Sequence, residues 1–117
     1  MLLAAIIIFS LTIFGGLLVA TGHREHYRPP KFVALAHGAG GVTGLILLLI
    51  TYMTTPEVMG TSGTLSLGLF ILAALFGLYL FSRRYTSSRT PQPVMLVHAT
   101  IAFTAYLLLI HTFMQTV

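Results

Sequence analysis

His37 and His98 are the residues of this 117-residue chain best suited to chemistry, because each interrupts a long apolar stretch. An ionisable side chain in such a stretch marks a candidate functional site. A segment with basic residues precedes each of these two apolar stretches. Each histidine lies about six residues, or roughly 8–10 Å, from that basic side of its stretch. Haem iron accepts two nitrogen ligands on opposite faces of its ring, an arrangement that suits electron transfer. We therefore expect His37 and His98 to bind the iron of one haem b.

Glycines near the histidines favour the same cofactor, because a porphyrin is far wider than a side chain and needs helices with little bulk around it. Several follow His37 directly, and Gly16 and Gly77 are expected at about the same depth on two other apolar stretches. The glycines predicted to line a haem slot are Gly16, Gly38, Gly41 and Gly77. The alternative is that small residues merely let helices approach closely, above all in the Gly40–Gly44 pattern.

A haem near the basic face would direct its propionates toward that face, where cations are candidate partners because carboxylates close to hydrocarbon need paired positive charges. The candidates are Arg28, Lys31, Arg84 and Arg89. The same side chains could instead set the topology and contact anionic lipid head groups.

Other uses of the histidine pair stay open. The pair could bind copper, although the chain has no cysteine and Met53 and Met114 lie at the opposite end. Each histidine could ligate its own chlorophyll-type pigment, or the two rings could form a structural hydrogen-bonded pair. His111 lies about 140° around its helix from His98. It could therefore serve a quinone pocket, a subunit contact or the lipid headgroup region.

Four apolar stretches must position these residues. The composition, with 56% hydrophobic and 7% charged residues, cannot cover a water-facing surface. It excludes an ordinary soluble enzyme and a nucleic-acid-binding domain. Stretches of about 20 apolar residues are typical of membrane-spanning helices. We expect an all-α integral membrane four-helix up-down bundle, a single domain with helices at about Leu2–Ala20, Phe32–Met53, Leu65–Phe81 and Val94–Met114.

The second half of the chain repeats the first at an offset of 61 residues over about 46 positions. His37 matches His98, and Gly16 matches Gly77. The predicted repeats, about 1–56 and about 62–117, are two helical hairpins related by a pseudo-two-fold axis along the membrane normal. Chance similarity between apolar sequences is the alternative.

All six lysines and arginines lie in or beside two of the three connectors, between the first and second stretches and between the third and fourth. Both connectors share one face of an up-down bundle. By the positive-inside rule that face is cytoplasmic and both termini are outside, as in a bacterial inner-membrane protein.

The four-helix layout, the His37/His98 pair and the adjacent glycines resemble the small four-helix membrane b-type cytochromes. The resemblance implies haem b held between helices, and electron exchange with a quinone, superoxide or a partner protein. Larger relatives often hold two haems with four histidines, and this chain lacks the second pair.

Two other functions compete with haem-based electron transfer. A small multidrug-type transporter needs an intramembrane carboxylate, whereas Glu25 and Glu57 both fall in connectors. A chain with so few polar groups could also be a cofactor-free accessory subunit that packs against a larger respiratory or redox complex, or it could form a homo-oligomer. The sequence shows no residue set for nucleophilic or hydrolytic catalysis.

Overall fold

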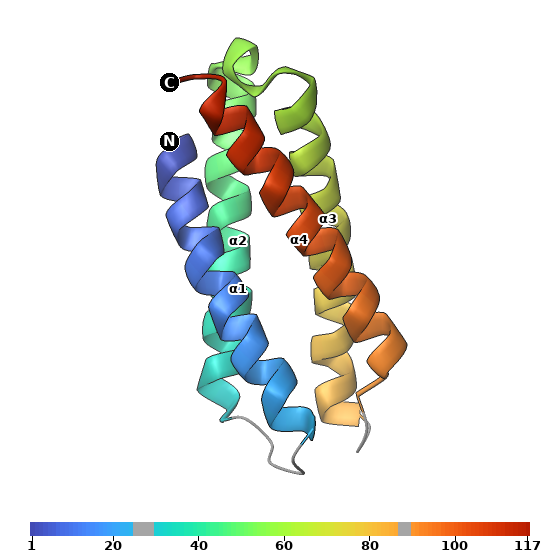
Figure 1. The fold of residues 1–117 in the computed structure, drawn as a ribbon. Coiled ribbons are helices and arrows are strands. Elements are labelled where there is room, and N and C mark those ends of the chain that lie inside the picture. The colour runs from blue at the N-terminus through green and yellow to red at the C-terminus, as the bar shows by residue number, and fades with distance from the viewer. Residues whose placement is uncertain (25–29, 87–89) are drawn as a thin grey trace.

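Four helices in up-down order make up the described fold. The computed structural model describes residues 1–24, 30–86 and 90–117, without the side chains of 22–24 and 85. The helices are α1 (Leu2–Arg24), α2 (Lys31–Thr54), α3 (Pro56–Thr86) and α4 (Gln92–Met114). Both termini and the α2–α3 connection lie at one end of the bundle, the terminal end (Figure 1). The last turns of α1 and α3 and the first turns of α2 and α4 lie at the opposite end, the basic end, which includes Arg24, Lys31, Arg83 and Arg84.

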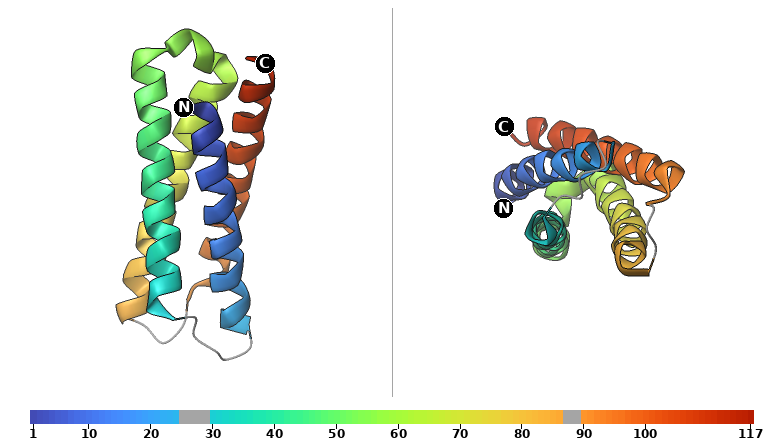
Figure 2. Two further views of the ribbon diagram at one scale, coloured as in Figure 1. Left: turned by 90° about the vertical axis from the view of Figure 1, so that its left-hand side faces the viewer. Right: turned by 90° about the horizontal axis from the view of Figure 1, so that it is seen from below.

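The helices pair as two hairpins. α1 packs along α2 and α3 along α4, while α2 meets α3 and α1 meets α4 less extensively. Figure 2 shows α1 and α2 side by side, and the whole structure measures 45 × 20 × 19 Å. Each of the four helices is long and apolar enough to cross a membrane. The structure therefore confirms an all-helical, four-helix fold.

The third helix is longer than predicted. The expected segment Leu65–Phe81 covers only the apolar centre of α3, which begins at Pro56 and ends at Thr86. Gly60 bends the helix near its start, with φ 51° and ψ −161°. Only glycine adopts this conformation readily, because a Cβ atom would clash with the backbone. The stretch from Pro56 to Gly63, which lies between the second and third predicted helices, is therefore part of a bent helix.

The hydrophobic core occupies only the terminal half of the bundle. At its centre the rings of Phe9 and Phe70 stack with centroids 3.8 Å apart and planes 2° from parallel. The other core side chains are Leu2, Ala5, Leu48, Met59, Leu67, Ala73, Ala105 and Leu109. No described residue in 12–21, 31–43, 74–86 or 92–104 is fully buried. The helices in the basic half therefore do not close around a core of their own.

Gly44→Ala is expected to destabilise the fold. An added Cβ would lie 2.7–2.9 Å from three ring atoms of Phe9, and the stack on Phe70 prevents that ring from moving aside. Overpacking of this kind costs about 1–3 kcal/mol. Thermal unfolding in detergent measures the loss, with Gly41→Ala as the matched control because its Cβ meets only a Thr12 methyl at 4.0 Å. Equal stability of the two variants would contradict this packing.

Candidate functional site

The fold brings His37 and His98 together at the level where the packed core ends. Each lies six residues after the first residue of its helix, α2 or α4, which is about 9 Å along the axis. Both rings are half-buried. Their centroids are 6.2 Å apart and their planes are 78° from parallel. The two rings thus face one another across the boundary between the hairpins.

The two imidazoles make the same hydrogen bond, each within its own hairpin. His37 Nδ1 lies 2.7 Å from the Thr12 carbonyl oxygen of α1, and His98 Nδ1 lies 2.8 Å from the Ala73 carbonyl oxygen of α3. A carbonyl oxygen can only accept, so each Nδ1 carries the proton and donates it. Nε2 then keeps its lone pair, which is the state of a metal-ligating histidine.

Gly16 and Gly77 lie directly against these rings. They follow Thr12 and Ala73 by four residues, and a helical side chain at that position leans back toward the preceding turn. A Cβ at Gly16 would lie 2.8 Å from His37 Cε1, and one at Gly77 would lie 3.1 Å from His98 Cε1. Their missing side chains make room for the imidazoles, a function that the sequence analysis did not identify.

The glycines that follow His37 divide into two groups. Gly40 and Gly44 face α1, where an added Cβ would overlap the Thr12 hydroxyl or the Phe9 ring. These two therefore allow close approach of α1 and α2, as the alternative interpretation of the Gly40–Gly44 pattern holds. A Cβ at Gly41 would be in ordinary contact with Thr12, and one at Gly38 would meet nothing within 4 Å.

Among the described residues, this site offers two side chains that could ligate a metal ion, His37 and His98. No group of three histidine, cysteine, aspartate or glutamate side chains gathers anywhere in the described ranges. The hydrogen bonds that the structure shows for the two imidazoles run to Thr12 and Ala73, and none joins one ring to the other. A metal bound here would need most of its ligands from another source.

The structure describes two of the four cations that were predicted to contact the haem propionates. Lys31 is exposed at the start of α2 and Arg84 is half-buried near the end of α3. Arg84 follows Gly77 by seven residues and so shares its face of the helix. Arg28 and Arg89 lie outside the described residues.

Arg83 is a candidate that the sequence analysis missed. Its Nε atom is buried and has no hydrogen-bond partner among the described residues. A buried guanidinium nitrogen usually has a partner, so an anion near the basic end would satisfy it. The adjacent arginines at 83 and 84 were the available signal in the sequence.

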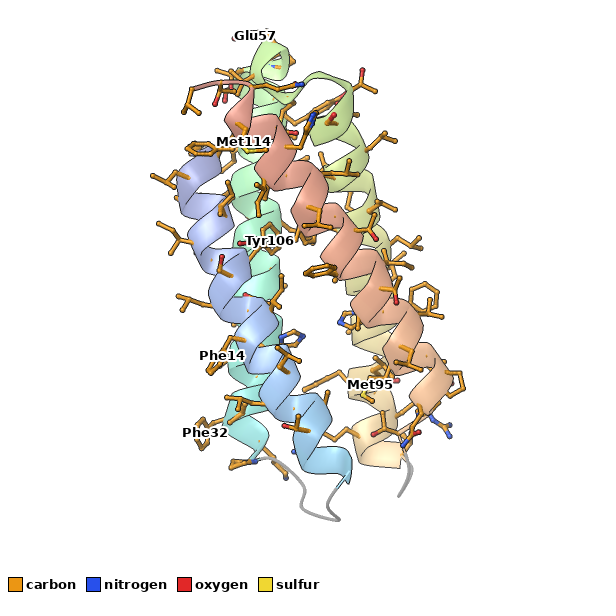
Figure 3. All side chains as sticks on the ribbon, viewed as in Figure 1. Phe14, Phe32, Glu57, Met95, Tyr106 and Met114 are labelled. Atoms are coloured by element: carbon orange, nitrogen blue, oxygen red, sulfur yellow. The ribbon has the colours of Figure 1, made fainter. Side chains whose placement is uncertain are left out.

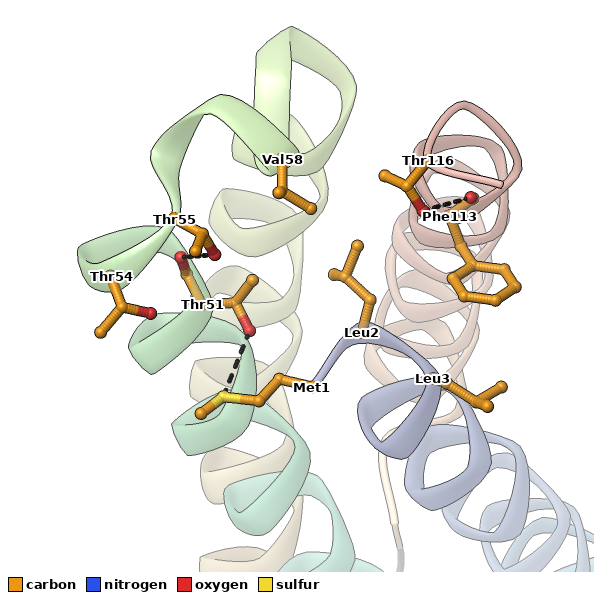
Figure 4. A pocket seen from close by; sticks show the side chains of 9 residues that line it. All are labelled: Met1, Leu2, Leu3, Thr51, Thr54, Thr55, Val58, Phe113 and Thr116. Atoms are coloured by element: carbon orange, nitrogen blue, oxygen red, sulfur yellow. Dashed lines mark hydrogen bonds between the residues drawn. The ribbon is translucent and has the colours of Figure 1, made fainter.

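The terminal end holds a separate cavity of about 390 Å³ (Figure 4). It lies between the ends of the helices, far along the bundle from the histidine pair. Its lining residues are Met1, Leu2, Leu3, Thr51, Thr54, Thr55, Val58, Phe113 and Thr116. His111 is exposed near the same end, and its Nε2 lies 3.4 Å from Gln115 Nε2.

Comparisons with protein-family models, with curated proteins and with solved structures find no match to this chain.

Proposed function

We propose that this chain is a membrane electron-transfer protein that binds one haem b between α2 and α4 through His37 and His98. One observation carries the proposal: both rings donate from Nδ1 to a carbonyl, and their centroids are 6.2 Å apart. Two imidazoles on opposite sides of one metal ion, with nitrogens about 2 Å from it, would have ring centres about 6 Å apart. The observed separation matches this value.

The donor set favours haem over a bare metal ion. Copper or zinc bound by two imidazoles would need further protein ligands, and the described residues offer no third histidine, cysteine or carboxylate. A porphyrin brings four nitrogens of its own, so His37 and His98 would complete the coordination of its iron. Haem supplies a reversible one-electron change at iron, and bis-histidine ligation suits electron transfer.

Each residue of the site has a separate part in this proposal. His37 and His98 ligate, and the Thr12 and Ala73 carbonyls orient their rings and raise their basicity. The stacked Phe9 and Phe70 rings close the site toward the terminal end. The cofactor would therefore extend toward the basic end, where no described residue is fully buried. There Lys31, Arg83 and Arg84 would supply cations for its propionates. Arg28 and Arg89, which lie outside the described residues, stay candidates from the sequence alone.

The proposal includes a membrane-spanning bundle built from two repeats. Residues 61 apart in the sequence meet or make equivalent contacts: Phe9 stacks on Phe70, and His37 faces His98. Thr12 and Ala73, at the same offset, accept the equivalent hydrogen bonds. These pairs support a pseudo-two-fold axis along the membrane normal. The positive-inside rule places the basic end in the cytoplasm and the termini outside, as in a bacterial inner membrane.

The absorption spectrum of the purified protein tests this function. Protein from haem-replete cells is expected to be red, with one haem per chain and a Soret band that sharpens and shifts when dithionite reduces it. A colourless preparation would contradict the proposal and favour a cofactor-free accessory subunit. A chlorophyll-type spectrum would favour pigment binding instead.

A further inference from the structure

The cavity at the terminal end has no part in the proposed haem site. Its wall is formed by the start of α1, the end of α2, the start of α3 and the end of α4 (Figure 4). Its volume of about 390 Å³ lies within the range of about 300–1,000 Å³ that is typical of small-ligand pockets. In the proposed membrane-spanning bundle this end lies where hydrocarbon meets water, so the head group of a lipid can reach it.

Apolar side chains form one part of the cavity wall. Leu2 is buried, and Val58 and Phe113 are partly buried and pack against the core. Leu3 also lines the cavity but is 54% exposed, and Ile7, one turn further along α1, is 52% exposed. Figure 3 shows carbon side chains projecting outward along α1 as far as Phe14. An acyl chain can therefore extend from the cavity along α1 in continuous apolar contact.

Four threonines form the polar part of the wall, and each has used its hydroxyl proton. The hydroxyls donate at 2.7–3.1 Å to carbonyl oxygens three or four residues earlier, in Thr51, Thr54, Thr55 and Thr116. Thr51 Oγ1 also lies 3.8 Å from Met1 Sδ, but the Leu47 carbonyl at 2.8 Å is the stronger acceptor. Within the described ranges none of the four hydroxyl oxygens accepts a hydrogen bond. A ligand here must therefore bring its own donors.

The cavity wall also favours a neutral ligand. None of the nine lining side chains is charged, and Glu57, at the same end, is exposed and does not line the cavity. A charged head group would lose water here without gaining an ion pair, which is costly. Hydroxyl groups are neutral and donate, so they match the four threonine oxygens.

We propose that this cavity binds the head group of a single-chain neutral lipid of the monoacylglycerol type. The O–H groups of the lipid donate to the threonine oxygens, and its acyl chain lies against Leu3 and Ile7 on α1. The site is separate from His37 and His98 and does not need a haem. It shares with the proposed function only the membrane-spanning bundle.

Thr51 and Thr112 form a matched pair for a test. They occupy equivalent positions 61 residues apart, and they are 3% and 2% exposed. Each donates at 2.8 Å to the carbonyl oxygen four residues earlier. Thr51 lines the cavity, whereas Thr112 does not. Replacement by valine removes the same hydroxyl from the same kind of position, so a difference in lipid binding comes from the cavity.

Native mass spectrometry of the full-length protein in detergent tests the inference, with 1-oleoylglycerol and methyl oleate as probes. The wild type is expected to bind one 1-oleoylglycerol more tightly than methyl oleate, which has the same acyl chain and no donor. Thr51→Val is expected to weaken 1-oleoylglycerol binding by about three- to tenfold and to leave methyl oleate unaffected. Thr112→Val is expected to bind both probes as the wild type does.

Val58→Phe gives a second readout, because the larger side chain fills the cavity and is expected to reduce the binding of both probes. Equal binding of the two probes by the wild type, equal effects of the two threonine variants, or full binding by Val58→Phe would overturn the inference. Tighter binding of oleate than of 1-oleoylglycerol would also overturn it, because the first turn of α1 would then select an anion. These measurements involve no haem, so the absorption spectrum decides the proposed function separately.

Discussion

His37→Ala and His98→Ala are each expected to abolish the low-spin haem spectrum. In the proposed site both imidazoles would ligate the iron, and within the described residues no other histidine approaches the pair. Loss of a partner outside the ligand shell already costs metal sites about 10- to 100-fold in affinity. Removal of a ligand itself is therefore expected to cost more than about 100-fold. Haem content per chain and the reduced spectrum measure the effect.

The control for this pair of variants is His111→Ala. His111 is exposed near the terminal end and contacts Gln115, so its loss should leave the spectrum unchanged. If only one of His37→Ala and His98→Ala loses the low-spin spectrum, the iron is not shared by the two rings. A spectrum retained in both variants would refute the site.

Gly16→Ala and Gly77→Ala are expected to weaken haem binding in a graded way. The new Cβ lies 2.8 Å from His37 Cε1 in the first variant and 3.1 Å from His98 Cε1 in the second. The His37 ring must therefore shift in the first variant, and the His98 ring must give by a few tenths of an ångström in the second. The expected loss of haem affinity is about 10- to 100-fold for Gly16→Ala and smaller for Gly77→Ala, because its overlap is smaller.

Gly68→Ala is the matched control for the two glycine variants. It makes the same substitution on α3, outside the predicted haem slot, and its Cβ meets no described atom within 4 Å. Competition with apomyoglobin for haem measures the affinities of all three variants and the wild type. Full affinity in Gly16→Ala would show that the ring does not need its present position. An equal loss in Gly68→Ala would show that the loss does not come from contact with the imidazole rings.

Much of the fold could be predicted from residue types and their spacing. A run of some 20 apolar residues can satisfy its backbone in lipid only as a helix, so the number of helices follows from the runs. The limits of α3 could not be predicted in this way, because Thr61, Ser62 and Thr64 interrupt the apolar run. Helical geometry tolerates those residues, and Gly60 turns the chain before them.

Residue types along the chain were enough to predict the four helices, their up-down order and the equal distance of His37 and His98 from the starts of their helices, because each depends only on distance along one chain segment. The packing of the helices was needed to show that the Thr12 and Ala73 carbonyls accept from the rings, and that Gly16 and Gly77 make room for the imidazoles. Such contacts depend on the rotation and offset of one helix against another. Packing across the whole interface sets both quantities, and the apolar pattern of a single helix does not contain them.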